Sequence, residues 1–209
     1  MLKLVRYFST NKSINQYNKS NILSAYNDLV KNRQMSLSLK LPCYQTKKYS
    51  NENDYNRSLK NITKRDLICL DGYTANNVEI ADVYDRTNNY LYHIKRGTKN
   101  IRVLSSQIVN GALLLHYYQE QKYLLNNQLI NQLNNQNINN KMLIDIDKYV
   151  KMHKIDIINS EYAYVFGIII PQKYNINNIS LNSQLSIGIT CNILRSLNIK
   201  YYIDFIPQI

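Results

Sequence analysis

The chain has 209 residues, enough for one full domain or for a domain with an added arm. It contains no run of about 20 apolar residues, so we expect no membrane-spanning helix. Its three cysteines lie far apart and form no Cys-x-x-Cys pair, which argues against a disulfide framework or zinc site and favours a reducing compartment.

The net charge of +12 is distributed unevenly. Residues 1–65 carry 13 Lys and Arg against 3 Asp and Glu, whereas residues 66–209 carry 13 against 11. We therefore predict a basic N-terminal arm with short helices over residues 1–65, followed by a nearly neutral core over residues 66–209. Basic arms bind polyanions, and without a compact basic amphipathic helix we expect nucleic acid as the partner and no membrane. Candidate contacts in this arm are Lys47, Lys48, Lys64 and Arg65.

The first 27 residues contain no acidic side chain. Arginine and hydroxyl residues without carboxylates are typical of a mitochondrial presequence, and Arg6-Tyr7-Phe8-Ser9 resembles a matrix-protease cleavage site. The pattern favours the mitochondrial matrix, with the cytoplasm as the alternative. A disordered or strand-forming N-terminus would account for the same residues.

Apolar positions at helical spacing predict a helix over residues 21–33, and a second, shorter helix is expected over 54–64. Residues 66–72 predict a buried strand that ends in a glycine turn. Two short strands follow at 78–84 and 90–95, joined by a loop of hairpin composition.

The second half of the core alternates helices and strands. Apolar residues at 104, 108, 112 and 115 predict a long helix from residue 101 to about 125. An Asn/Gln-rich insertion occupies 126–140. The remaining predicted elements are a helix at 143–153, a central strand at 162–170, a helix at 181–197 and a final strand at 200–206.

This order predicts an α/β sandwich of αβββαβαβ topology. Acidic and lysine side chains fall on its adjacent short strands: Asp71, Glu79, Asp82 and Lys95. The combination is typical of a metal-dependent nuclease core of the restriction-endonuclease type.

Six short motifs between residues 37 and 125 add a resemblance. They are Leu41-Pro42-Cys43-Tyr44, Glu52-Asn53-Asp54-Tyr55-Asn56, Leu70-Asp71, Val78-Glu79-Ile80-Ala81-Asp82, Tyr92-His93-Ile94-Lys95 and Leu104 to Gly111. In order and spacing the chain resembles a sporadically distributed family of uncharacterised bacterial proteins. The family's Cys falls on Ala81, its second His on Ser106 and its Gln on Asn110. The resemblance implies the architecture and no particular reaction.

The candidate catalytic residues are Glu79, Asp82, His93 and Lys95. A nuclease of this type needs carboxylates to hold Mg²⁺, for which Asp71, Glu79 and Asp82 are the candidate ligands, and a lysine to orient or deprotonate water. His93 and Lys95 are two residues apart and so face the same side of a strand. An imidazole suits a softer metal, a general base or no metal at all.

Strand register decides which carboxylate joins them. If Tyr84 pairs with Tyr90, Glu79 lies opposite Lys95. A slip of one residue that sets Asp82 opposite Leu91 places Asp82 on the face of His93 and Lys95 instead. A bulge would bring in both acids. A cross-strand ion pair between Glu79 and Lys95, without catalysis, is a further alternative.

Arg96, Lys99 and Arg102 follow the candidate site and suit phosphate contacts, which the start of the helix at residue 101 would support. Three functions remain open. The first is a metal-dependent nuclease acting on DNA or RNA, with Mg²⁺ as cofactor. The second is a catalytically inactive RNA-binding accessory subunit of a ribonucleoprotein, such as an organellar ribosome. The third is a protein-interaction module with partners in a larger complex.

Overall fold

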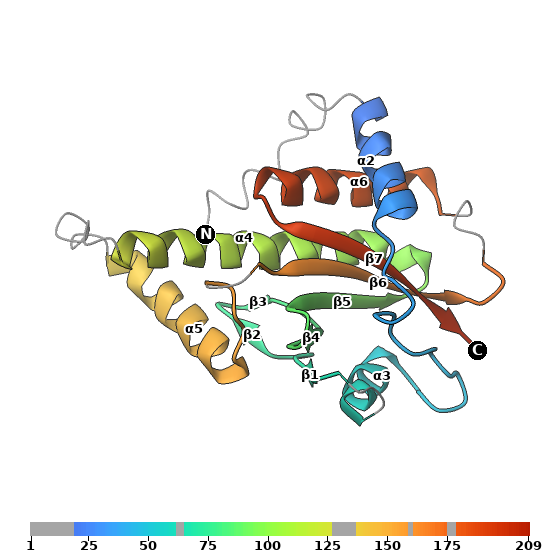
Figure 1. The fold of residues 1–209 in the computed structure, drawn as a ribbon, viewed down its shortest axis with the longest axis horizontal. Helices are drawn as coiled ribbons and strands as arrows, with labels where there is room; N and C mark the ends of the chain where they lie inside the picture. Colours follow the sequence, from blue (N-terminus) through green and yellow to red (C-terminus); the bar gives the residue numbers. More distant parts are fainter. Residues whose placement is uncertain (1–18, 62–64, 127–136, 159–160, 175–178) are drawn as a thin grey trace.

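A computed structural model describes residues 19–61, 65–126, 137–158, 161–174 and 179–209. Its centre is a five-stranded mixed sheet with the order β1-β4-β5-β6-β7 (Figure 1). The strands are β1 (Leu67–Cys69), β4 (Val83–Asp85), β5 (Tyr90–Arg96), β6 (Ala163–Pro171) and β7 (Lys200–Gln208). The first three are antiparallel neighbours, and β5, β6 and β7 run parallel. A separate two-stranded hairpin joins β2 (Thr74–Ala75) to β3 (Val78–Glu79).

Helices cover the sheet (Figure 1). They are α2 (Lys19–Asn32), α3 (Glu52–Ser58), α4 (Ile101–Asn126), α5 (Asn137–His153) and α6 (Leu181–Ser196), with short 3-10 helices η2 (Leu59–Asn61) and η3 (Thr98–Asn100). Helix α4 packs against β5 and β6, α6 packs against α4 and β7, and α2 packs on α6. The molecule is therefore a mixed α/β fold, as predicted, and its main elements follow the predicted order.

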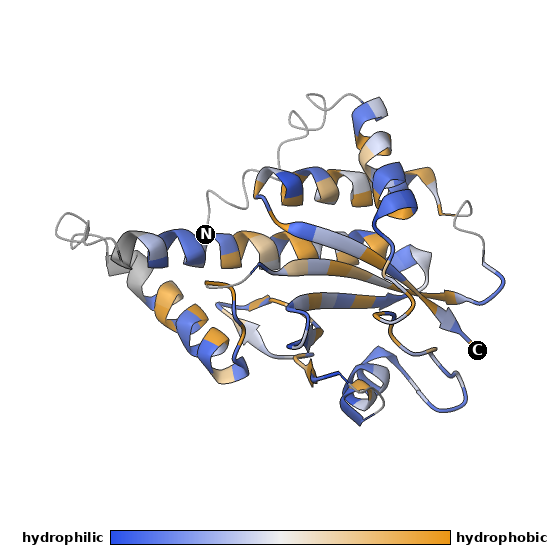
Figure 2. Ribbon diagram, in the orientation of Figure 1, coloured by the Kyte–Doolittle hydropathy of each residue, from blue (hydrophilic) through white to orange (hydrophobic). Residues whose placement is uncertain are grey.

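Both faces of the sheet are buried, because side chains alternate between two apolar clusters. On one face Leu91 and Phe166 join α2, α4, α5 and α6. On the other face Tyr92 and Val165 pack against tyrosines of the segment 35–61. β6 has buried neighbours on both sides and is apolar along most of its length (Figure 2), as a central parallel strand should be.

Residues 19–61 belong to this folded unit and do not form the separate basic arm expected from the charge distribution. Gln34 forms a parallel bridge with Ile203 and Tyr44 with Gln208, so the segment runs beside β7. Tyr44 and Tyr55 are fully buried. Most lysines of the segment are exposed, whereas its buried apolar residues pack against the second face of the sheet. A count of charged residues detects the exposed lysines but does not detect the buried apolar residues between them.

The strand predicted over residues 78–84 is divided in two. Asn76 and Asn77 both have positive φ, the turn geometry that closes a tight hairpin, so Val78–Glu79 pairs with β2. Val83–Asp85 then joins the main sheet, and residues 80–82 are in neither strand. Within the predicted insertion 126–140, residue 126 ends α4 and residues 137–140 begin α5, while 127–136 lie outside the described residues.

In the described segments no helix has the length and apolar character needed to cross a membrane. Residues 1–18, which carry the presequence-like pattern, lie outside them.

Candidate functional site

The candidate site lies where β5 continues past the end of β4. Backbone pairing between the two strands ends at Val83 and Tyr92, and the Asp82 N–H then donates to the Tyr92 carbonyl at 2.8 Å. Beyond this point two carboxylates replace the missing strand. Asp82 Oδ2 accepts from the Ile94 N–H at 2.6 Å, and Glu52 accepts from the Arg96 N–H. These two carboxylates therefore satisfy backbone N–H groups of β5 that have no partner strand beyond the end of β4.

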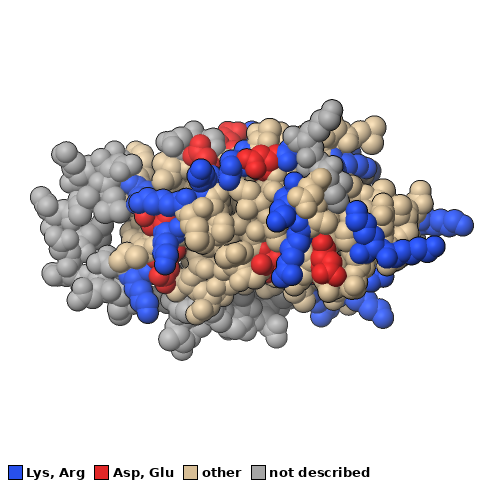
Figure 3. Space-filling view, turned by 90° about the horizontal axis from the view of Figure 1, so that it is seen from below, with Lys and Arg blue, Asp and Glu red and all other residues tan. Residues whose placement is uncertain are grey.

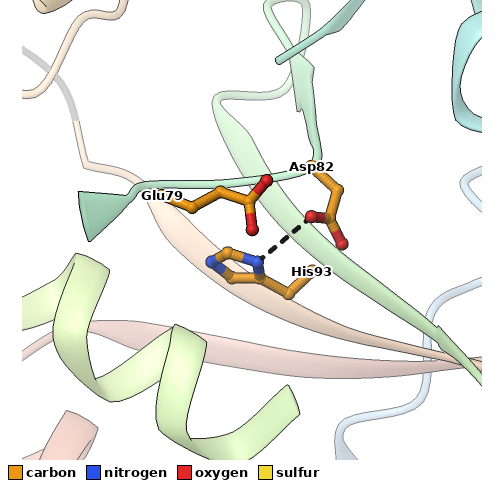
Figure 4. A group of neighbouring side chains, drawn as sticks. All are labelled: Glu79, Asp82 and His93. Atoms are coloured by element: carbon orange, nitrogen blue, oxygen red, sulfur yellow. Dashed lines mark ion pairs between the residues drawn. The ribbon is translucent and has the colours of Figure 1, made fainter. Parts of the chain in front are cut away.

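Three metal-ligating groups meet beside this edge. One ligand atom from each of Glu79, Asp82 and His93 lies within 4.8 Å of the other two. Figure 4 shows both carboxylates turned toward the imidazole, with His93 Nδ1 3.6 Å from Asp82 Oδ1. His93 is 0% exposed, and neither ring nitrogen has a hydrogen-bond partner among the described residues. A buried imidazole without partners is costly, so the site fits a ligand that the nitrogen can bind.

Lys95 places a cation next to this group. Its Nζ lies 3.6 Å from Asp82 Oδ2 and 3.6 Å from Glu52 Oε2. The Lys95 side chain is 17% exposed, whereas that of Asp82 is 2% exposed. The ammonium group thus bridges the buried Asp82 carboxylate and the partly exposed Glu52 carboxylate.

Glu79 is held by two donors. Gln107 Nε2 on α4 donates to Glu79 Oε2 at 2.6 Å, and the Gly72 N–H donates to Oε1 at 3.2 Å. Helix α4 comes this close because Gly111 has no side chain: a Cβ there would lie 2.9 Å from the Ile80 carbonyl oxygen. The packing of α4 therefore fixes the segment that carries both acidic residues.

The two carboxyl groups have pKa values shifted in opposite directions. Burial raises the pKa of Glu79, and the neighbouring Asp82 carboxylate raises it further. For Asp82, burial also raises the pKa, but His93, Lys95 and the Ile94 N–H outweigh it and lower the pKa below its usual value. Carboxyl groups whose surroundings separate their pKa values are common at functional sites.

Neither of the two proposed strand registers is the observed one. Tyr84 pairs with Leu91, one residue from the first alternative, and Val83 pairs with Tyr92. Asp82 therefore comes beside His93 directly, and Glu79 reaches the same place from the separate hairpin. Both acids join the site, as the third alternative expected, but through a break between two strands and not through a bulge.

Asp71 lies outside the group of three ligands. Its Oδ2 accepts from Asn56 Nδ2 at 3.1 Å, which links it to α3.

The predicted phosphate contacts fall into two classes. Arg96, Lys99, Arg102, Lys47 and Lys48 are exposed. They lie in segments 96–103 and 43–50, near the carboxyl ends of β5 and β7. Figure 3 shows Lys and Arg side chains at the right-hand end of the molecule, the end at which Figure 1 marks the C-terminus.

Arg65 is a structural residue by contrast. Its Nη1 lies 3.1 Å from Asp85 Oδ2 and also donates to the Leu39 carbonyl at 2.7 Å, which ties the segment 35–61 to β4. Lys64 lies outside the described residues.

Sequence reasoning missed Glu52, Gln107 and Tyr149. Glu52 contacts Lys95, and Gln107 contacts Glu79. Tyr149 lies on α5, where burial, together with the charges of Glu79 and Asp82, raises the pKa of its hydroxyl. Glu52 begins one of the six short motifs singled out in the sequence, and Gln107 lies within another. Their place in those motifs was the available signal, since no local pattern connects residue 52 with residue 95.

The chain matches no curated protein and no solved structure. A family model does match, over residues 6–207, which is nearly the whole chain. The expectation of an uncharacterised family is therefore confirmed: the chain belongs to the family of unknown function DUF6119.

Proposed function

We propose that this protein binds a divalent metal ion through Glu79, Asp82 and His93 and hydrolyses phosphodiester bonds of nucleic acid. The observation that carries the proposal is the convergence of three ligating groups on one point, with the Lys95 ammonium 3.6 Å from one of them. Two carboxylates and an imidazole can hold a metal ion, and a lysine beside them can orient the attacking water, as metal-dependent phosphodiester hydrolysis uses them.

The chain's own residues have separate roles in this scheme. A bound metal ion would polarise the phosphate and lower the pKa of its water. Lys95, held between Glu52 and Asp82, orients the attacking water and binds the charge that develops on the phosphate oxygens. Glu52 positions Lys95, and Gln107 positions Glu79.

The restriction-endonuclease-type core is part of the same proposal. Three antiparallel strands followed by parallel strands, with acidic residues ahead of the second strand and a His-x-Lys on the third, support it. Nucleic acid as substrate is supported by the exposed Arg96, Lys99 and Arg102 that follow Lys95 directly along the chain.

Cleavage of plasmid DNA and of structured RNA, each with Mg²⁺, Mn²⁺ or EDTA, tests the function. We expect cleavage that EDTA abolishes and that Lys95→Ala lowers by about 100-fold or more, since a positioned charge at the reacting phosphate is lost. Lys31→Ala, an exposed lysine on α2, is the matched control and should cleave normally. Cleavage that persists undiminished in folded Lys95→Ala would remove Lys95 from the mechanism.

A second candidate function is nucleic-acid binding without cleavage, as in an accessory subunit of a ribonucleoprotein. Ser106 in place of the family's histidine favours it, together with the exposed basic residues. In that case the same assays show no cleavage with any metal, while binding weakens steeply as salt concentration rises.

A further inference from the structure

We propose that the metal site selects a first-row transition-metal ion of the Mn²⁺ and Zn²⁺ class over Mg²⁺, because one of its three protein ligands is an imidazole. This inference rests on the metal-binding part of the proposed function and specifies its cofactor. It replaces the Mg²⁺ that the carboxylates alone would suggest.

The chemistry of the donor set is the first argument. Mg²⁺ prefers oxygen ligands, whereas imidazole nitrogen suits Zn²⁺, Cu²⁺, Fe²⁺ and Ni²⁺ best. Mn²⁺ is the weakest binder of the first-row series and also takes carboxylates, but it accepts imidazole more readily than Mg²⁺ does. A metal in this group would meet two carboxylates and one imidazole. No cysteine belongs to the group, so the ligands are nitrogen and oxygen only.

The geometry of the imidazole is the second argument. The 3.6 Å between His93 Nδ1 and Asp82 Oδ1 is too long for a hydrogen bond. It is close to the spacing of two neighbouring ligands on one ion, about 3.0–3.5 Å when each metal–ligand bond is about 2.0–2.2 Å. Figure 4 shows both carboxylates beside the ring, and the three ligand atoms, within 4.8 Å of one another, must move closer together to share one ion.

Burial is the third argument. Mg²⁺ gives up its hydration water reluctantly and usually keeps several water ligands. Here His93 is fully buried, and Asp82 is nearly so. An ion that binds both must exchange water for protein ligands on its inner side, which favours metals that form strong bonds to nitrogen. The two His93 nitrogens have no hydrogen-bond partner among the described residues, so a metal ion that binds nitrogen would also satisfy a buried polar atom.

Metal binding by the full-length apoprotein tests this inference without reference to activity. Mn²⁺ binding is followed by electron paramagnetic resonance and calorimetry, and Mg²⁺ is then added as competitor. We expect Mn²⁺ to bind at least about tenfold more tightly than Mg²⁺. Co²⁺ should give visible absorption bands that report nitrogen and oxygen ligation.

Two variants and a control assign the preference to His93. His93→Asp supplies a third carboxylate, and His93→Asn removes the imidazole without adding charge; both should lower the Mn²⁺ to Mg²⁺ affinity ratio by about tenfold. His116→Asp is the control, because His116 lies on α4 beside Glu120 and away from the site. It should keep the wild-type ratio.

The outcomes separate this inference from the proposed function. Equal affinity of the wild-type protein for Mn²⁺ and Mg²⁺, or an unchanged ratio in the folded His93 variants, overturns the metal selectivity even if nucleic acid is cleaved. Selective Mn²⁺ binding without cleavage of any nucleic acid supports the selectivity and overturns the nuclease. If the His93 variants do not fold, the wild-type competition and the Co²⁺ spectrum decide alone.

Discussion

Asp204 on β7 is a buried carboxyl group outside the candidate site. Its Oδ2 accepts from the Leu41 N–H at 2.8 Å, and its Oδ1 has no hydrogen-bond partner among the described residues. Burial raises its pKa to about 6, against smaller opposing effects of the Leu41 N–H, Lys40 and Arg65. The folded protein therefore keeps a proton that the unfolded chain has already released, which couples stability to pH.

We predict that the free energy of unfolding decreases as pH rises from about 4 through about 6. The raised pKa makes the folded state the stronger proton binder over that window, so the effect amounts to about 3 kcal/mol and is constant above it. Asp204→Asn should lose this part of the pH dependence. Urea unfolding at several pH values measures it.

Asp66→Asn serves as the control for Asp204, because Asp66 is exposed and pairs with Arg86 on the surface. It should keep the wild-type slope. An equally steep slope in Asp204→Asn would show that other groups cause the pH dependence.

At the same scale, residue chemistry in the sequence was sufficient to select Glu79, Asp82, His93 and Lys95, which the structure brings together. It was not sufficient for Glu52, because a contact across 43 residues, from position 52 to position 95, depends on how α3 docks. Asp71 was selected by type and position alone, and its side chain turns toward α3.

At the scale of elements, the approach of α4 to the segment 80–82 decides the shape of the site. A Cβ at Gly111 would lie 2.7 Å from the Tyr164 hydroxyl and 2.9 Å from the Ile80 carbonyl oxygen. Real side chains essentially never approach so closely, so the helix or the segment must move if a methyl group is added.

Gly111→Ala is accordingly expected to lower the free energy of unfolding by about 1–3 kcal/mol, because the close contact is made partly with backbone. It should also weaken metal binding, since Ile80 lies between Glu79 and Asp82. Chemical denaturation and the Mn²⁺ titration measure the two effects. Asn110→Ala, an exposed neighbour on the same helix, should change neither. Wild-type stability in Gly111→Ala would mean that the contact relaxes freely.

Hydrophobic periodicity predicted the existence and type of the main elements, since apolar spacing follows from the faces that a helix or strand must bury. It did not predict the break between Val78–Glu79 and Val83–Asp85. Both pieces carry strand-forming residues, and the positive-φ turn at Asn76 and Asn77 decides which partner the first piece takes.

At the scale of the whole molecule, residues 19–61 complete the fold and are not appended to it. α2 crosses α6 where Gly188 allows close approach: a Cβ there would lie 2.2 Å from the Ile22 carbonyl oxygen. The following segment covers the second face of the sheet with buried tyrosines. Residues 19–61 thus contribute to the covering of both faces of the sheet (Figure 1).

Leu29→Ala on α2 should therefore destabilise the protein by about 2–5 kcal/mol, as for any fully buried leucine, in a single unfolding transition. Leu37→Ala is the matched control, because Leu37 is 89% exposed and its loss should cost little. Urea unfolding followed by circular dichroism distinguishes them. A Leu29→Ala protein of wild-type stability would show that α2 is peripheral.

The amino-acid sequence by itself determined the mixed α/β class, the order of the main elements, the membership of an uncharacterised family and four residues that meet at one place. These conclusions follow from the spacing of apolar residues, from short sequence motifs and from side-chain chemistry, all of which can be read from residues close together in the sequence. Only the tertiary structure decided that Asp82 meets His93 through a third register, that Glu52 holds Lys95, and that residues 19–61 are part of the core. Those outcomes depend on contacts between segments that are distant in sequence. Burying both faces of the sheet and hydrogen-bonding the free edge of β5 stabilise the fold more than any local conformational preference does.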